Sequence, residues 1–258
     1  KINKEMAMLR RDSLAWLSVL LATAPLSSMA GEFRPNSIAD GVGLPQGAVL
    51  VGMADIDITP EFPVRLAGYA GRMDEASEVV ARLSAKALAV GGDDGDGPAV
   101  LIMLENCSAT AKLTHDVSAR LEEKAGVRPE RCAVVSTHTH SAPLLPGFAP
   151  WHYTKPMPPE HLANMERYLV ELTERLEKVA LEALASCKPG RLAWSQGVVT
   201  FGSNRRRLEN GKWVGFVRGN ETDSPGPVDH SLPVLRVTDL TGKLLGVVAN
   251  YACHCTTT

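Results

Sequence analysis

The chain has 258 residues, of which 45% are hydrophobic and 22% charged, and its formal net charge at pH 7 is −2. This composition is typical of a globular protein with one large domain or two small ones. The near-neutral charge balance offers no electrostatic footprint for nucleic acid, so we expect no such partner.

The first thirty residues have the pattern of a leader with an export signal. Arg10 and Arg11 form a positive region, residues 14–26 an apolar core, and Ser28-Met-Ala30 a small-x-small cleavage site. The apolar core is too short to span a bilayer comfortably. An uncleaved anchor or an amphipathic arm is the alternative. We predict an exported protein, either secreted or periplasmic.

Residues 31–47 are rich in Gly, Pro and Asn, which predicts a linker, and residues 48–258 then form the domain. Helical spacing predicts helices at 110–125 and 159–187, the second ended by residues 188–190. Apolar runs predict strands at 48–57, 83–90, 99–104, 132–136, 192–200, 232–237 and 244–251. We therefore expect a mixed α/β fold with helices flanking a β-sheet, and a parallel crossover between residues 99 and 136.

Two loops are also informative. Gly68 and Tyr69 lie in a glycine-containing turn, where the backbone can approach another group closely. Three consecutive arginines, residues 205–207, follow the strand predicted at 192–200. Such a run is usually a solvated or anion-attracting loop, but an Arg just after a strand can instead hold an oxyanion or a carboxylate.

The segment 132–143, CAVVSTHTHSAP, contains the principal candidate site. A short β-branched run turns polar, and His138 and His140 follow two residues apart. An extended chain has a side-chain period of two, so both imidazoles are predicted to project from one face. Open α/β sheets place ligand sites at the carboxyl ends of their strands. Two loop histidines with ordinary hydrogen-bond partners are the alternative.

The strand predicted at 244–251 leads into a further histidine, His254, which lies between Cys253 and Cys255. Two buried strands that each end in histidine can bring imidazoles to one edge of a sheet, as a zinc site requires. At least one more donor is needed. The two cysteines would lie on the face opposite His254 if the chain stays extended, which argues against three ligands from this segment.

Several hydrolase and nucleotide-binding motifs are absent from the sequence. It contains no His-Glu-x-x-His, no Gly-x-Ser-x-Gly and no dinucleotide-type glycine fingerprint. Ser141 and Ala142 stand where the metallo-β-lactamase-like hydrolases require Asp-His. A zinc hydrolase of another kind remains.

The segment 137–143, THTHSAP, resembles the Thr-His-Thr-His-Ser-Gly-Pro of the neutral (non-lysosomal) ceramidase family. Residues 51–60 and 68–69 resemble the family's opening, residues 203–205 its Asn-Arg segment, and residues 247–254 its later strand that ends in a zinc histidine. These matches follow the family's order from about residue 48 to residue 258. They imply the N-terminal part of a ceramidase-like, metallohydrolase catalytic domain.

By this resemblance, His138 and His254 would bind Zn2+, while His140 and Arg205 would contact the substrate amide and the developing oxyanion. Two further residues would line the same pocket: Gly68 and Tyr69. The implied reaction is hydrolysis of the N-acyl amide of ceramide or a similar lipid, with possible access to substrate at a membrane surface. We expect no obligate protein partner.

The sequence also departs from the family pattern. The family's glutamate and tyrosine zinc ligands, and its serine, have no counterpart up to residue 258, so we expect a domain truncated at its C-terminus and inactive alone. Ala142 replaces a glycine, which suggests a divergent bacterial-type branch. Two alternatives stay open: a metallohydrolase of another amide or ester, and a non-catalytic exported binding module.

Overall fold

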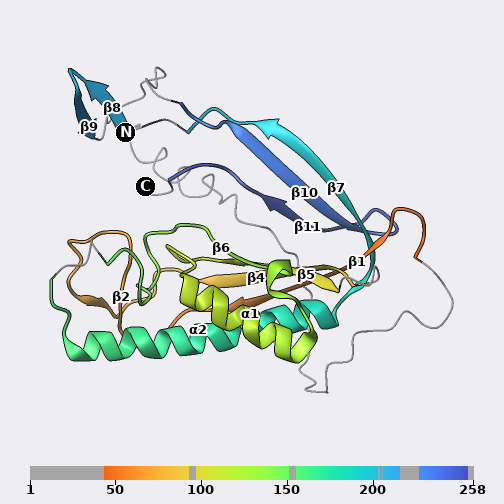
Figure 1. Cartoon of the computed structure of the whole chain (residues 1–258), viewed down its shortest axis with the longest axis horizontal. Coiled ribbons are helices and arrows are strands. Elements are labelled where there is room, and N and C mark those ends of the chain that lie inside the picture. Colours follow the sequence, from red (N-terminus) through yellow and green to blue (C-terminus); the bar gives the residue numbers. More distant parts are fainter. Residues whose placement is uncertain are drawn as a thin grey trace, which may run out of the picture.

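The computed structural model describes residues 44–92, 97–150, 155–202, 204, 206–215 and 227–254. The export signal, most of the linker and Arg205 lie outside these residues. The described chain forms a mixed seven-stranded sheet with two α-helices against one of its faces (Figure 1). The predicted α/β fold is therefore confirmed.

The large sheet has the strand order β11-β10-β7-β1-β4-β5-β6, and two small hairpins, β2-β3 and β8-β9, lie apart from it. The large sheet comprises β1 (Val49–Asp57), β4 (Ser84–Gly91), β5 (Pro98–Leu104), β6 (Cys132–Ser136), β7 (Lys188–Val198), β10 (Ser231–Asp239) and β11 (Leu244–Ala249). The hairpins comprise β2 (Val64–Arg65), β3 (Glu75–Ala76), β8 (Arg206–Glu209) and β9 (Lys212–Gly215). Among the described strands, β5 and β6 form the one parallel pair, which confirms the predicted crossover.

Helix α1 (Ala111–Ala125) connects β5 to β6, and a single turn of 3-10 helix (Pro129–Arg131) precedes β6. The Thr110 hydroxyl accepts a hydrogen bond from the Leu113 N–H and caps the start of α1. Gly126 ends it in a left-handed conformation at φ 64°, and its N–H donates to the Glu122 carbonyl. Local capping at Thr110 and Gly126 therefore determines both ends of α1, which lie within one residue of the predicted ends.

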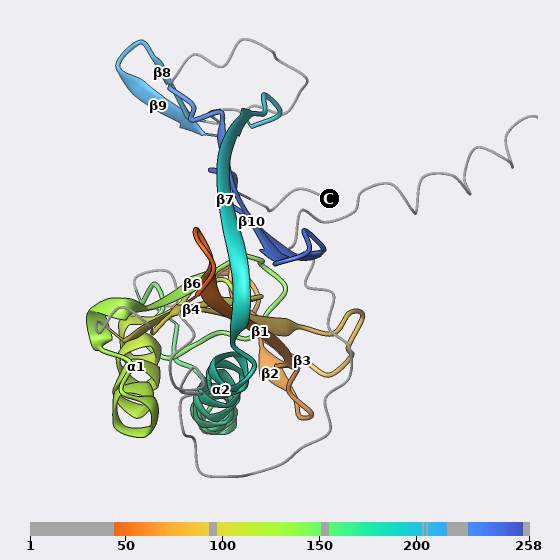
Figure 2. The ribbon, with the colours of Figure 1, turned by 90° about the vertical axis from the view of Figure 1, so that its right-hand side faces the viewer.

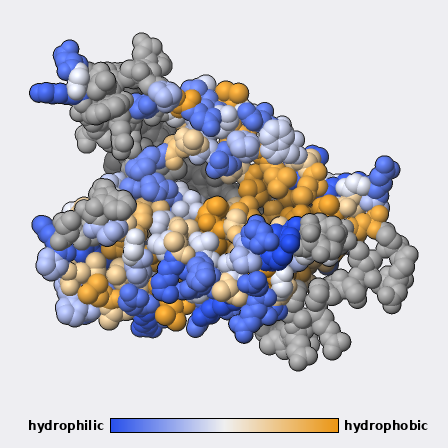
Figure 3. All heavy atoms as spheres, viewed as in Figure 1, coloured by the Kyte–Doolittle hydropathy of each residue, from blue (hydrophilic) through white to orange (hydrophobic). Residues whose placement is uncertain are grey.

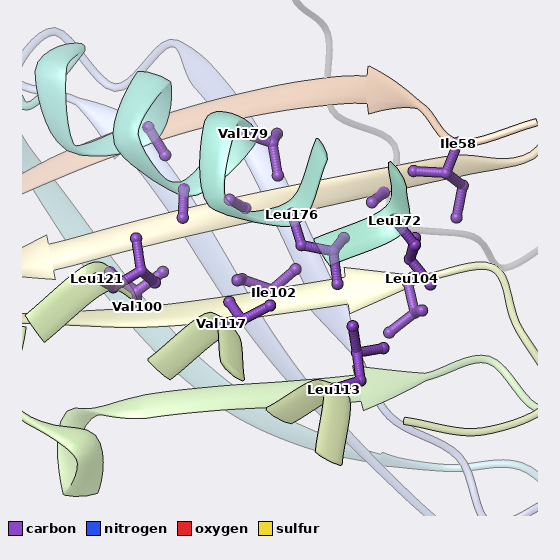
Figure 4. Close-up of a cluster of buried hydrophobic side chains, with 14 of the residues drawn as sticks. Ile58, Val100, Ile102, Leu104, Leu113, Val117, Leu121, Leu172, Leu176 and Val179 are labelled. Atoms are coloured by element: carbon purple, nitrogen blue, oxygen red, sulfur yellow. The ribbon is translucent and has the colours of Figure 1, made fainter. Parts of the chain in front are cut away.

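Helix α2 (Pro159–Ala185) packs beside α1, and together the helices bury one face of the sheet. Figure 4 shows Leu113, Val117 and Leu121 of α1 and Leu172, Leu176 and Val179 of α2 in one apolar cluster between the helices and the sheet. The apolar residues of α2 that recur at helical spacing, among them Leu169, Leu172, Leu176 and Val179, are buried, whereas Leu162 near the start of the helix is 42% exposed. Within the described residues, no helix is apolar enough over a sufficient length to cross a membrane.

Strand β7 divides the sheet into two parts. Its first three residues pair with β1, whereas its whole remaining length pairs with β10 alone. Helix α2 ends at Ala185, two residues before the predicted end, but residues 188–190 already begin β7, four residues before the predicted start of this strand. Gly190 lies where the strands diverge, and a Cβ there would lie 2.5 Å from Val51 Cγ2 and 2.7 Å from the Thr238 carbonyl oxygen. Only glycine allows the three strands to approach this closely.

Beyond this point, β7, β10 and β11 rise away from the layer of β1, β4, β5 and β6 (Figure 2). We call these three strands the arm. Apolar side chains fill the angle between the arm and the layer, among them Val51, Leu88 and Val237. Figure 3 shows apolar surface in this region, where the arm descends to the layer. The curled sheet brings its two edge strands, β6 and β11, toward each other.

One ion-pair group joins the two helices. The Glu177 carboxylate of α2 accepts hydrogen bonds from Lys124 and, at 3.0 Å, from Arg120, both on α1. Burial raises the pKa of Glu177, but the hydrogen bonds from Lys124 and Arg120 lower it by more, so the carboxyl titrates below its ordinary value of 4.5. The ionised carboxylate therefore stabilises the packing of α1 on α2.

We predict that Glu177→Gln lowers the free energy of unfolding by about 1 kcal/mol at pH 7, a modest value because the two cations are partly exposed. Since the folded-state pKa is depressed, this contribution is complete above pH 4.5 and is lost as the pH falls through the folded-state value. Urea unfolding of the parent protein and of Glu177→Gln at pH values above and below 4.5 measures this difference in free energy.

The matched control is Glu182→Gln on the same helix. Glu182 faces Lys178 at 3.9 Å, and both side chains are about half exposed or more. We expect its effect to stay within about 0.5 kcal/mol at every pH. Equal effects of the two substitutions would show that the Glu177 group contributes no special stability.

Candidate metal centre

His138 lies two residues beyond the end of β6, in a left-handed backbone conformation with φ 61°. The Thr137 N–H still donates to the Leu104 carbonyl at 3.1 Å, so the turn follows immediately after the last sheet-like bond. Our prediction of an extended His-x-His was therefore wrong. A non-glycine residue in this region costs about 1–2 kcal/mol, so contacts around His138 must stabilise this conformation.

A backbone hydrogen bond orients the His138 ring. Its Nδ1 lies 2.7 Å from the Cys107 carbonyl oxygen. Because a carbonyl can only accept, Nδ1 carries the proton and Nε2 presents its lone pair. Histidines that bind metals are commonly held in this way by a carbonyl on the far ring nitrogen. The geometry of His138 is thus that of a ligand acting through Nε2.

The His140 ring lies beside His138, although the two residues do not share an extended strand. It is only 9% exposed, and its Nε2 lies 3.3 Å from His138 Nε2. The rings of His140 and Tyr69 pack edge to face, with their centroids 5.0 Å apart. The two imidazoles therefore direct the same nitrogen toward a common point.

His254 reaches this point from the opposite edge of the sheet. It follows β11, and its ring centroid lies 4.8 Å from that of His138 and 4.9 Å from that of His140. Neither β6 nor β11 is the buried strand that we predicted, because both are edge strands with partly exposed residues. The three histidines meet because the sheet curls.

Cys107 is a residue of this site that the sequence did not indicate. Its Sγ lies 3.8 Å from His138 Nδ1, and potential ligand atoms of Cys107, His138 and His140 lie within 4.8 Å of one another. We nevertheless place this thiol behind the His138 ring, since the nearby Nδ1 already binds a carbonyl. Burial also raises the pKa of the Cys107 thiol, which keeps it protonated at neutral pH. The predicted parallel crossover could have indicated Cys107, because parallel pairing of β5 and β6 places the residues after Leu104 beside those after Ser136.

The three imidazoles fit a zinc ion in donor type, and their spacing makes both His140 and His254 geometrically able to be the second ligand beside His138. Two nitrogen ligands about 2.0–2.1 Å from a tetrahedral zinc lie about 3.3–3.4 Å apart. The observed separation of the His138 and His140 Nε2 atoms is 3.3 Å. The part of the chain that the structure describes thus brings together five of the six candidate residues, His138, His140, His254, Gly68 and Tyr69, while Arg205 lies outside it.

Comparison with known families identifies the family of this chain. Residues 49–258 match the family described as "Neutral/alkaline non-lysosomal ceramidase, N-terminal". The chain belongs to this family. The resemblance drawn from the sequence motifs is therefore confirmed, and the roles of individual residues stay predictions.

Two solved structures share the fold of this ceramidase-family chain. One is a ceramidase complexed with C2, with 24% sequence identity and a TM-score of 0.61 over 82% of this chain. The other is neutral ceramidase from Pseudomonas aeruginosa, with 23% identity and a TM-score of 0.61 over 83% of this chain. In both cases the match covers 32% of the solved chain, so this chain spans about a third of their length.

Gly68 forms the backbone surface against which the His140 ring packs. Its φ is 97°, and a Cβ at this position would lie 2.2 Å from His140 Cγ. The next glycine of the same loop, Gly71, differs on both counts, because a Cβ added there would meet no atom within 4 Å and its φ is not positive. The predicted close approach at the glycine turn is thus present at Gly68 and directed at His140.

We predict that Gly68→Ala lowers the free energy of unfolding by about 2 kcal/mol or more, since left-handed strain adds to the overlap with His140. Gly71→Ala, the matched control, should change it by less than about 0.5 kcal/mol. Denaturant unfolding of the two variants and the parent measures both values. A neutral Gly68→Ala variant would contradict the close packing of His140 on this backbone.

Proposed function

We propose that this chain forms the N-terminal part of the catalytic domain of an exported, zinc-dependent amidohydrolase that cleaves the N-acyl amide of ceramide-like lipids. The observation that carries the proposal is the meeting of three imidazoles, from opposite edges of one sheet, in a member of the ceramidase family. An exported binding module has no evident need for this convergence.

In this proposal His138 and His254 hold the zinc ion. The bond from His138 Nδ1 to the Cys107 carbonyl supports this role, since it presents the lone pair of Nε2. When bound, zinc would supply Lewis-acid polarisation of the amide carbonyl and of the attacking water. The chain's own residues would orient the substrate and the proton-transfer groups around it.

His140 and Arg205 are proposed to act on the substrate amide. His140 is nearly buried between Gly68, Tyr69 and His138, which supports a fixed ring orientation. A positioned donor stabilises the charge that develops on the carbonyl oxygen during attack. The guanidinium of Arg205 would supply a second such donor from the segment between β7 and β8.

Exposed apolar side chains on the segments that lead to the histidines support a lipid substrate. Val135, three residues before His138, is 44% exposed. Phe201 is 72% exposed, and its ring lies 4.7 Å from that of Tyr251, which precedes His254 by three residues. Acyl and sphingoid chains could bind such surfaces, at a membrane surface or from solution. Another amide or ester with an apolar tail is the nearest alternative substrate.

Metal binding tests the first part of the proposal. We predict that His138→Ala lowers zinc affinity by more than about 100-fold, because it removes a ligand. Loss of a residue that only hydrogen-bonds to a ligand lowers metal affinity by up to about 100-fold. His140→Ala should leave affinity within about threefold. Competition titration with a chromogenic chelator measures both, and His115→Ala on the exposed face of α1 is the control.

The outcomes of this titration are distinct. Equal loss of zinc from His138→Ala and His140→Ala would make His140 a ligand, which the 3.3 Å separation of their Nε2 atoms permits geometrically. A parent protein with no zinc affinity above that of the His138→Ala variant would contradict the zinc centre and favour the binding module.

Hydrolysis tests the second part. We predict that Arg205→Lys in the full-length protein lowers kcat by roughly 10²–10³-fold on a short-acyl ceramide, because an ammonium cannot reproduce the planar fork of a guanidinium. Arg207→Lys is the matched control in the same run and should stay within about twofold. Fatty-acid release measures both. Unchanged turnover in Arg205→Lys would contradict its role, and cleavage of the ester analogue alone would establish the alternative substrate.

A further inference from the structure

The loop that carries His140 is bound to the loop that follows β2. The Ala67 N–H donates to the Ala142 carbonyl at 2.9 Å, and the Leu144 N–H donates to the Arg65 carbonyl at 2.7 Å. An isolated antiparallel bridge pairs Leu66 with Pro143 between these bonds. The position of His140 therefore depends on residues some seventy positions earlier in the chain.

Arg72 connects these two loops at His140. Its Nη1 donates to the His140 carbonyl and, at 3.2 Å, to the Ala67 carbonyl. Its guanidinium also lies 4.6 Å from the centroid of the Tyr69 ring, which in turn contacts the His140 ring. A single side chain thus binds the backbone of His140 and supports the aromatic wall beside its imidazole.

Arg72 is itself held in place by the loop. Its N–H donates to the Tyr69 carbonyl at 3.1 Å, and its carbonyl accepts from Arg65 Nε at 2.9 Å. Arg65 is buried, and Arg72 is half-buried. Because both backbone groups of Arg72 are bound, the backbone is already ordered, and only side-chain entropy is lost when the guanidinium binds the His140 carbonyl.

We propose that Arg72 is a positioning residue that fixes the orientation of the His140 ring against Tyr69 and Gly68. The effect on ring orientation is independent of the reaction. Its consequence for catalysis rests on the proposed function, since it requires His140 to contact the substrate amide. A misplacement of about 1 Å in such a group can lower a rate by roughly 100-fold.

The test compares Arg72→Met and Arg72→Lys with a matched control, Arg167→Met. Arg167 also lies over an aromatic ring, with its guanidinium 3.9 Å from the centroid of Phe62, and it binds Glu171 on α2. Removing it deletes the same kind of contact at a position that carries no catalytic candidate. All three variants are made in the full-length protein.

The first readout is the long-range proton–nitrogen NMR spectrum of the histidine rings. We expect Arg72→Met to shift or broaden the ring resonances of His140, while those of His115 stay unchanged. The second readout is kinetic: kcat on a short-acyl ceramide should fall by roughly 10–100-fold with KM within about threefold. Arg72→Lys should lose less, because an ammonium keeps the charge over Tyr69 and one hydrogen bond.

The possible failures can be distinguished. Unaltered His140 resonances and unaltered kcat in Arg72→Met, or equal changes in Arg167→Met, would overturn the role of Arg72 and leave the proposed function standing. Altered resonances in a protein that cleaves no amide would uphold the positioning and overturn the proposed function. If Arg72→Met does not fold, Arg72→Lys decides: His140 resonances and kcat identical to the parent would overturn the role.

Discussion

The pairing of β7 with two different neighbours allows histidines from opposite edges of the sheet to meet. Lys188 to Gly190 bind β1, and the residues that follow bind β10, so the strand passes from the layer into the arm. Right-handed twist rotates each strand of a sheet relative to its neighbours but does not by itself bring the two edges together. The divergence at Gly190 adds a sharp change of direction. Without it, β6 and β11 would remain at distant edges and their histidines could not meet.

Each histidine then needs a local constraint that secondary structure does not supply. His138 leaves its strand through a left-handed turn, and the Cys107 carbonyl fixes its ring. His140 packs on the bare backbone of Gly68. These constraints destabilise the loops when considered alone, because left-handed backbone and buried imidazole both carry a cost. The pairing of Leu66 with Pro143 and the buried core under both helices offset that cost.

The elements of the fold could be predicted because their signals are local. Thr110 and Gly126 mark the ends of α1, and β-branched runs mark the strands. The start of β7 could not, since residues 188–190 combine a proline and a glycine, which usually end an element. Their strand conformation depends on β1 and β10, which are distant in sequence. The convergence of the histidines was predicted, but the extended His-x-His on which that prediction partly rested is absent, since His138 is left-handed. No sequence pattern around Cys107 indicates that its carbonyl binds the His138 ring.

The convergence also has an energetic consequence for the arm. Most residues of β7 beyond Gly190 are exposed, so apolar burial secures the arm mainly near its base. His138 belongs to the layer and His254 to the end of the arm. A metal ion bound by both would be bonded to both parts of the sheet. Its binding free energy would then stabilise the curled sheet, because a ligand that binds only one conformation stabilises that conformation. The metal centre and the curl of the sheet would therefore support each other: the curl places the imidazoles, and the ion holds the curl.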